Sequence, residues 1–294
     1  MRAVAAKFPL HISAPATAPQ GTALAVTLPH LALYKSWVPS MDEGWTRFIF
    51  DQNGIPYTSV VDADLRKGNL RARFDAIILP DNSPNAIIAG RSGREGGVPQ
   101  PPTPPEFTGG LGKDGTTALE AFAHAGGTIV ALNKASDVYA TREASDVVDV
   151  LQGLPPKEFY VPGSILEVKV DTSSPIGFGS TPTVPIFFET SPAFQLSGSA
   201  KSLATYTSAH PLLSGWLLGG AKLNGTSALV EQPMGQGRLI LFGFRPQYRA
   251  HSEGTYKLFF NALLYAAETP VTLGAKAAVS EAAAPATAAS SHGQ

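Results

Sequence analysis

Cysteine is absent from the sequence, so disulfides, thiolate metal sites, iron–sulfur clusters and cysteine nucleophiles are all excluded. The sequence also lacks any run of about 18 apolar residues, the length that a membrane-spanning helix needs, and we expect no membrane span. The formal net charge is only −1 at pH 7. It gives no electrostatic reason to expect nucleic acid as a partner.

Three motifs with known chemistry are missing or lack their structural context. None of the six histidines begins a His-Glu-x-x-His pattern. Zinc needs several ligands at compatible spacing, so we expect no metal site in this chain. The Gly-x-Ser-x-Gly pattern of serine hydrolases does not occur. Residues 110–115 match Gly-x-Gly-x-x-Gly, but a Pro-rich segment precedes them where a dinucleotide site needs a strand. We interpret them as a hinge that enters a helix.

Both ends of the chain have few large apolar groups. Residues 1–27 are rich in Ala, Pro and Thr and are interpreted as a linker. Residues 270–294 are predicted to be a disordered tail, because they bury too little apolar surface to offset the entropy of ordering. The first ten residues are interrupted by a lysine and a proline and make a poor secretion signal. One α/β domain is therefore expected over residues 28–269.

The first part of this domain has the pattern of a βαβ unit. An apolar run at Leu31–Tyr34 precedes Ser40-Met-Asp-Glu43, a capping box that predicts the start of a helix. Asn53-Gly54 predicts its end. The residues expected on the buried face of this helix are Trp45, Phe48 and Ile49.

The runs Tyr57–Val61 and Phe74–Asp81 are predicted to be parallel strands, because strands covered on both faces lose the apolar/polar alternation. An open α/β sheet binds ligands at the carboxyl ends of its strands. Any site should therefore involve Trp37, Asp42 and Asp81.

A Pro- and Gly-rich segment at residues 82–115 follows, and its length favours a flap over the strand ends. Next we expect a helix at residues 114–125, with Thr117 and Glu120 in capping-box spacing and with Leu119 and Phe122 facing inward.

The next buried strand is predicted at residues 128–132, and Ser136 beyond it is expected to cap a helix. Alternation at Leu166–Val170 predicts an antiparallel strand within a β-rich insertion at about residues 157–200. Residues 228–244 have the pattern of a hairpin.

Polar and aromatic residues near the expected strand ends are the candidate ligand contacts. They are Trp37, Asp42, Asp81, Asn133, Lys134, Arg245, Gln247, His251 and Glu253. Arg245 has two interpretations. At a strand end it can hold a carboxylate bidentately, or it is a buried arginine that pairs with Asp81 or Asp42 to fix the fold. Glu43 is assigned to helix capping, and Asp62 and Asp64 to a turn.

Several blocks together resemble a known family. They are Lys35–Trp37, Met41–Arg47, Tyr57–Arg71, Phe74–Asp81, His210–Trp216 and Gly243–Gln247. They are similar to the C-terminal region behind the catalytic domain of bacterial carboxypeptidase A-like zinc peptidases. This resemblance implies a flavodoxin-like fold of the class I glutamine amidotransferase type: an open parallel sheet with helices on both faces, here with an antiparallel β extension.

The departures from this family decide the expected function. Class I amidotransferases use a cysteine on the elbow after the central strand, whereas this elbow has Asn133-Lys-Ala135. Arg245 and Gln247 stand where the base and its orienting acid would be. Neither nucleophile nor base remains for glutaminase chemistry, and the zinc ligands of the peptidase are missing too. The resemblance thus implies a noncatalytic accessory domain, without a cofactor in this chain.

The implied partner is a zinc carboxypeptidase catalytic domain, in the same chain or in another, which would hold the zinc. A peptide or a glycan is the candidate ligand of the crevice, and the relatives are generally exported. The alternative is a free-standing hydrolase or binding protein with a rebuilt site at the same crevice. That site would use Asp42, Asp81, Arg245, His251 and Glu253 and needs at least two of them at one substrate position.

Overall fold

The computed structural model describes residue 17 and residues 20–91, 102–141 and 145–273. The chain divides into two compact units, one of residues 26–268 and one that contains both termini. In the terminal unit, β1 (Gly21–Val26) and β14 (Glu268–Leu273) form a two-stranded sheet. These strands overlap the ends of the predicted linker and tail, since backbone pairing between strands does not require large apolar side chains. Most of the remaining predicted linker and tail lies outside the described residues.

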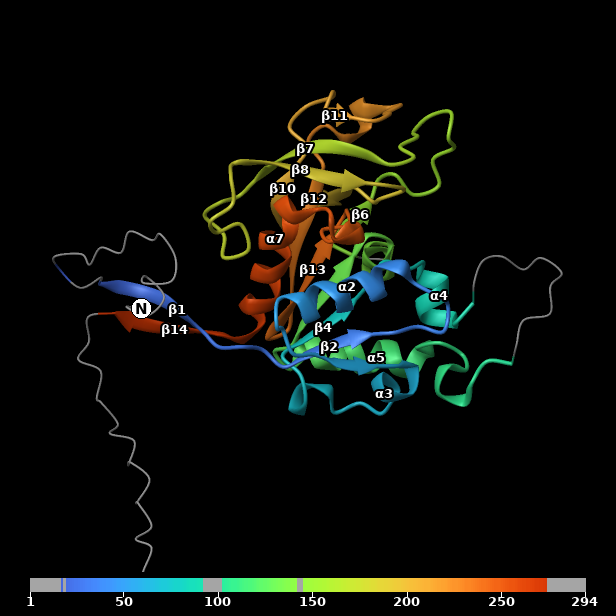
Figure 1. The fold of residues 1–294 in the computed structure, drawn as a ribbon, viewed down its shortest axis with the longest axis vertical. Coiled ribbons are helices and arrows are strands. Elements are labelled where there is room, and N and C mark those ends of the chain that lie inside the picture. The colour runs from blue at the N-terminus through green and yellow to red at the C-terminus, as the bar shows by residue number, and fades with distance from the viewer. Residues whose placement is uncertain (1–16, 18–19, 92–101, 142–144, 274–294) are drawn as a thin grey trace, which may run out of the picture. The chain divides into compact units, whose positions relative to one another are not determined.

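A mixed sheet of 12 strands spans the larger unit (Figure 1). Five of its strands run parallel in the order β13-β5-β4-β2-β3. Their bounds are β2 (Leu31–Tyr34), β3 (Thr58–Val60), β4 (Ala76–Leu79), β5 (Thr128–Leu132) and β13 (Gly237–Phe242). The prediction of an open parallel sheet with helices on both faces is confirmed.

Alternate residues of the parallel strands contribute to two cores, one on each face of the sheet. Leu31 and Leu33 of β2 share a core with α2 and α7, whereas Ala32 and Tyr34 share the other core with α3 and α5. Successive strand residues point to opposite faces, and helices cover both, so these strands are continuous apolar runs in the sequence. The helix bounds are α2 (Met41–Gln52), α3 (Asp62–Arg66), α4 (Pro84–Ala89), α5 (Gly112–His124), α6 (Asp137–Ala140) and α7 (Glu253–Leu264).

Helix α2 begins as the sequence predicts, since the Ser40 hydroxyl accepts a hydrogen bond from the Glu43 backbone N–H. Glu43 does not complete the capping box, however, because its carboxylate pairs with Arg47 one turn later. The expected buried face is also wrong at Phe48, which is 46% exposed. The buried residues of α2 are Asp42, Thr46, Ile49 and Phe50. Two of them are polar, so hydrophobicity alone could not find this face.

The segment at residues 82–115, which is predicted to be a flap, has regular structure in its described part. It contains α4, where the Ser83 hydroxyl accepts from the Ala86 N–H, and residues 92–101 within it lie outside the described part of the chain. Helix α5 begins at Gly112 without a side-chain cap. Thr117 therefore lies inside the helix and caps nothing, whereas Leu119 and Phe122 are buried as predicted.

Gly109 and Gly110 offer a matched test of how closely α4 approaches the start of α5. Both have left-handed φ angles, +82° and +62°. A Cβ on Gly110 would overlap the Gly90 backbone nitrogen, whereas a Cβ on Gly109 meets no atom within 4 Å. Gly109→Ala is expected to lower the free energy of unfolding by about 1 kcal/mol through backbone strain. Gly110→Ala is expected to lower it by about 1–3 kcal/mol more, because the two helix ends must separate. Urea denaturation checks this difference, and equal losses would contradict the close approach.

An antiparallel extension continues the sheet beyond β13. β12 (Ser227–Met234) pairs with β13 as the predicted hairpin. β7 (Ser164–Val170) buries alternate residues as predicted. The other strands of the extension are β6 (Val147–Asp149), β8 (Thr183–Phe188), β9 (Phe194–Leu196), β10 (Lys201–Thr205) and β11 (Leu212–Ser214). The extension therefore reaches well past the expected end of the insertion at residue 200.

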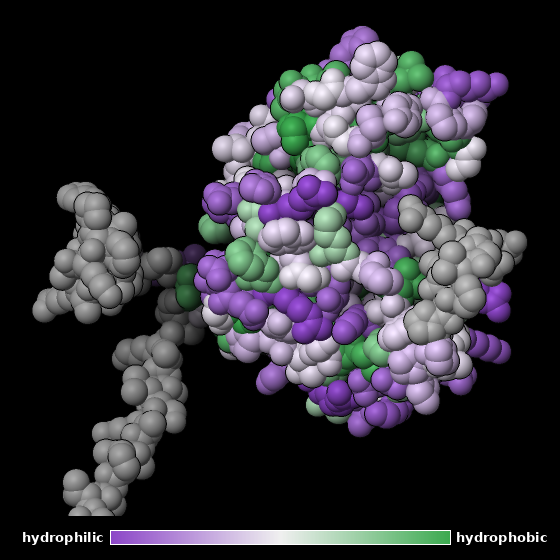
Figure 2. Space-filling model, turned by 45° about the vertical axis from the view of Figure 1, so that its right-hand side comes forward, coloured by the Kyte–Doolittle hydropathy of each residue, from purple (hydrophilic) through white to green (hydrophobic). Residues whose placement is uncertain are grey.

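Large apolar side chains lie exposed around β11. Leu213 and Trp216 are 55% and 63% exposed, and Leu212, Leu218 and Tyr160 are exposed as well. We name these five residues the apolar patch. Figure 2 shows hydrophobic residues among polar ones at the top of the view, where Figure 1 places β7 and β11. Within the described ranges, no helix combines the length and the apolar character needed to cross a membrane.

Candidate ligand-binding site

Arg245, just beyond β13, contacts three carboxylates from distant parts of the chain. Its Nη2 lies 2.5 Å from Asp81 Oδ2, after β4, and its Nη1 lies 2.6 Å from Glu189 Oε2, after β8. Its Nε lies 3.1 Å from Asp42 Oδ2 on α2, but the two atoms are not aligned as a hydrogen bond. The structure thus shows the internally paired arginine of the second interpretation. Its paired donors are not free to hold an external carboxylate.

Asp81 joins the ends of β4 and β5. Its Oδ1 accepts hydrogen bonds from Asn133 Nδ2 at 2.9 Å and from the Lys134 backbone N–H at 3.0 Å. Asn133 directly follows β5 and has a φ of 51°, a left-handed conformation that is uncommon for a non-glycine residue. The chain therefore turns sharply at this strand end, with an asparagine on the turn.

Asp42 is a deeply buried carboxyl group of the crevice, at 2% exposure. Neither of its oxygens accepts a hydrogen bond within the described part of the chain. Its pKa is raised to about 7, mainly by burial and also by the nearby Asp81 and Glu189 carboxylates, while Arg245 and Arg249 oppose the rise. Near neutral pH, Asp42 therefore exchanges a proton.

Lys134 is also paired internally. Its Nζ lies 3.0 Å from Asp137 Oδ2 and 3.7 Å from Asp149 Oδ2. Burial raises the pKa of Asp137 to about 6, against the opposing effect of the Lys134 ammonium, and Asp149 adds to the rise. The second cation of the crevice is thus flanked by two carboxyl groups.

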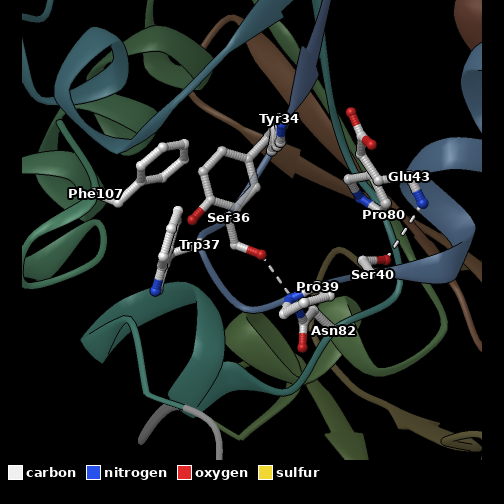
Figure 3. A pocket seen from close by; sticks show the side chains of 10 residues that line it. Tyr34, Ser36, Trp37, Pro39, Ser40, Glu43, Pro80, Asn82 and Phe107 are labelled. Carbon is white, nitrogen blue, oxygen red and sulfur yellow. Dashed lines mark hydrogen bonds between the residues drawn. The ribbon is translucent and has the colours of Figure 1, made fainter. Parts of the chain in front are cut away.

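Two neighbouring cavities open at this edge of the sheet. The first, of about 260 Å³, we name the acidic cavity. Its lining comprises Pro39, Ser40, Met41, Asp42, Asp81, Asn82, Ser83, Lys134 and Arg245. The second, of about 280 Å³, we name the aromatic cavity (Figure 3), lined by Tyr34, Lys35, Ser36, Trp37, Pro39, Ser40, Glu43, Pro80, Asn82 and Phe107. Pro39, Ser40 and Asn82 line both cavities, so the two lie side by side.

Trp37 and Phe107 form one wall of the aromatic cavity. Their ring centroids are 5.4 Å apart and the rings are tilted by 43°. In Figure 3 both rings lie beside Tyr34, across the cavity from Ser40 and Glu43. The arrangement offers apolar ring faces next to hydroxyl, amide and carboxyl groups.

Four of the predicted site residues line neither cavity, and one of them, Asn133, reaches the site only through its hydrogen bond to Asp81. Gln247 is fully buried, and its Nε2 donates to Thr46 Oγ1 at 2.9 Å, which fixes α2 against the segment after β13. His251 and Glu253 are exposed and line neither cavity. Of the residues that the rebuilt-enzyme alternative names, Asp42, Asp81 and Arg245 line the acidic cavity, whereas His251 and Glu253 do not.

Two structural assignments made from the sequence are corrected here. The Ser136 hydroxyl does not cap a helix; it donates to the carbonyls of Ala131 and Phe242 and so bridges β5 and β13. Asp62 does not lie in an exposed turn. It is buried at the start of α3 and accepts a hydrogen bond of 2.5 Å from the Tyr34 hydroxyl. Burial raises the pKa of Asp62 to about 6.

Sequence reasoning missed Glu189, Asp137, Asp149 and Phe107. The sequence does contain an indication of Glu189, because this charged residue directly follows the apolar end of β8. It was overlooked because an antiparallel strand was not expected to end at the crevice of the parallel strands. Among the described residues, no group of three or more histidines, aspartates and glutamates is arranged to hold a metal ion.

Comparison with solved structures agrees with this fold. PurLQS from Thermotoga maritima has a TM-score of 0.53 at 13% identity, and the match covers 81% of this chain and 99% of that one. A protein described as a GMP synthase subunit from Thermoplasma acidophilum has a TM-score of 0.50 at 12% identity, covering 81% and 94%. The fold is therefore of the class I glutamine amidotransferase type. No protein-family model and no curated protein sequence matches the chain.

Proposed function

We propose that this chain is a noncatalytic binding domain built on an amidotransferase-like fold. The observation that carries this proposal is Asn133 on the turn after β5, with its amide donating to Asp81. A nucleophile at that position would need a thiol or hydroxyl and an adjacent base, and the chain has no cysteine. Arg245 and Gln247 further support the proposal, since internal contacts engage both side chains.

The purified chain is expected to release no ammonia from glutamine above the rate of buffer. It is also expected to release no C-terminal residue from peptides, with or without added zinc. The physical reason is the absence of an activated nucleophile from the crevice. Coupled ammonia detection and mass spectrometry of the peptides measure both rates. Hydrolysis that a chelator abolishes would refute the proposal.

We further propose that the partner is a zinc carboxypeptidase catalytic domain. Support comes from the sequence blocks that resemble the region behind such domains, because Met41–Arg47, Phe74–Asp81 and Gly243–Gln247 supply Asp42, Asp81 and Arg245 to one cluster. The apolar patch gives a second support. Exposed apolar surface of this kind marks interaction sites, and the block His210–Trp216 supplies three of its residues.

The DNA upstream of the Met1 codon identifies the catalytic domain to test. It is expected to encode a His-x-x-Glu zinc peptidase domain, in frame or as a neighbouring gene. That domain is expected to bind this chain in calorimetry, and Trp216→Ala is expected to weaken the association about tenfold or more, as at other interfaces with central aromatic residues. Phe178→Ala is the matched control, because Phe178 is 74% exposed outside the patch. Equal effects of both variants, or no association, would contradict this partner.

A further inference from the structure

Two carboxyl groups and two cations line the acidic cavity, and each of the two cations also contacts carboxyl groups outside the lining. Arg245 is surrounded by Asp42, Asp81 and Glu189. Lys134 is flanked by two further aspartates. A ligand anion that entered the cavity would meet these carboxylates, and Nη1 and Nη2 of Arg245 already donate to Glu189 and Asp81. Charge complementarity therefore favours a cationic group in this cavity.

Asp42 gives an independent indication of a missing donor. It lines the cavity and is 2% exposed, and its Oδ1 accepts no hydrogen bond from the described residues, while its Oδ2 lies 3.1 Å from Arg245 Nε without an aligned hydrogen bond. Buried polar atoms in native proteins nearly always have a partner. The nearby N–H of Glu43 is already directed at the Ser40 hydroxyl. A donor that entered through the cavity would satisfy the Asp42 carboxylate.

The aromatic cavity specifies what lies next to this cationic group. It neighbours the acidic cavity, because Ser40 and Asn82 line both, and Trp37 and Phe107 present their rings there. Aromatic faces attract ammonium groups within about 6 Å and pack against apolar groups. One ligand with both features can use both cavities.

We propose that the acidic cavity binds the primary ammonium group of a ligand whose adjoining apolar group lies in the aromatic cavity. The amino end of a peptide with a large first side chain belongs to this class. This inference rests on the noncatalytic binding role proposed above and names the ligand class of that site. In the complex, the ammonium donates to Asp42, and the apolar group packs against Trp37 and Phe107.

Binding of the ammonium is linked to the proton on Asp42. The charged groups that face Asp42 are Arg245, Asp81, Glu189 and Arg249. Because burial holds the pKa of Asp42 at about 7, the carboxyl group is largely protonated at pH 5.5 and largely ionised at pH 8. A bound ammonium favours the ionised form, so affinity is expected to rise over this interval with release of a proton.

The test uses three small probes that differ only at the polar end. They are 2-phenylethylamine, 2-phenylethanol and 3-phenylpropionate. The amine is protonated at neutral pH, as in lysine. Calorimetry at pH 8 is expected to show the amine binding about tenfold or more tighter than the alcohol and the anion. Buffers with different ionisation enthalpies report the released proton.

Two variants and one control locate the binding site. Asp42→Asn is expected to weaken binding of the amine about tenfold and to remove its pH dependence. Trp37→Ala is expected to weaken binding of the amine and the alcohol alike. The control is Asp51→Asn, since Asp51 is an exposed carboxylate on the same helix and should leave affinity unchanged.

The inference is overturned if the alcohol or the anion binds as tightly as the amine, if none of the probes binds at millimolar concentration, or if Asp42→Asn binds the amine normally. Each of these results leaves the noncatalytic role intact. Release of ammonia from glutamine would instead refute that role, whichever probe binds.

Discussion

Replacing Arg245 with alanine is expected to lower the free energy of unfolding by about 3–5 kcal/mol, the usual loss when one partner of a buried ion pair is removed. The guanidinium is the cation shared by Asp42, Asp81 and Glu189. Its loss leaves three carboxyl groups together without compensation. The loss is expected to be larger at pH 8 than at pH 5, because protonation of Asp42 relieves part of the repulsion. Urea denaturation at both pH values measures it.

Arg47→Ala is the matched control for this prediction. Arg47 is an arginine of the same domain whose side chain is 32% exposed and pairs with Glu43 along α2. Exposed pairs of this kind contribute only about 0.3–0.5 kcal/mol. Similar losses of unfolding free energy for the two variants would mean that the Arg245 cluster is solvated. They would then contradict the buried cluster of charges on which the proposed ligand of the acidic cavity depends.

Asp42→Asn is expected to stabilise the protein at pH 8 and to flatten its stability profile below that pH. The pKa of Asp42 is raised from 3.8 to about 7, mainly by burial. Between these values the folded state holds a proton that the unfolded chain has lost, so the free energy of unfolding falls as pH rises through this window. At about 1.4 kcal/mol per unit, the fall reaches on the order of 4 kcal/mol above pH 7. Asparagine has no such titration.

Thermal and urea unfolding across pH 4 to 8 check this second prediction. Asp137 and Asp62, whose pKa values burial raises to about 6, add slopes of the same sign that the variant keeps. Asp51→Asn is the control and should reproduce the unmodified profile, because Asp51 is exposed on the same helix. An unchanged slope in Asp42→Asn would show that the Asp42 carboxyl group ionises at an ordinary pKa.

Much of the parallel sheet could be predicted from the sequence because burial on both faces leaves a plain signal. The runs at Leu31–Tyr34, Ala76–Leu79 and Thr128–Leu132 are continuous apolar segments and form adjacent strands. Their carboxyl ends meet at one edge, so Asp81 and Asn133 could be placed together from the pattern of strands alone. The hydrogen bond between them follows from that topology.

The sequence was less informative where polar groups are buried. Asp42 and Thr46 face the core of α2, so an apolar stripe could not identify the buried side. Glu189 reaches Arg245 from an antiparallel strand whose place in the sheet depends on pairing with distant residues. No local sequence pattern predicts such strand pairing, because the pairing depends on the tertiary context.

The position of β13 has a consequence for the order of folding. This strand comes last among the parallel strands in the chain, yet it lies between β5 and β12 in the sheet. It also precedes Arg245, which is 164 residues away from Asp81 in sequence. A growing polypeptide must therefore expose Asp42 and Asp81 before their counter-ion has been synthesised. Contacts over such separations slow folding, and we expect the larger unit to acquire its structure in one late, cooperative step.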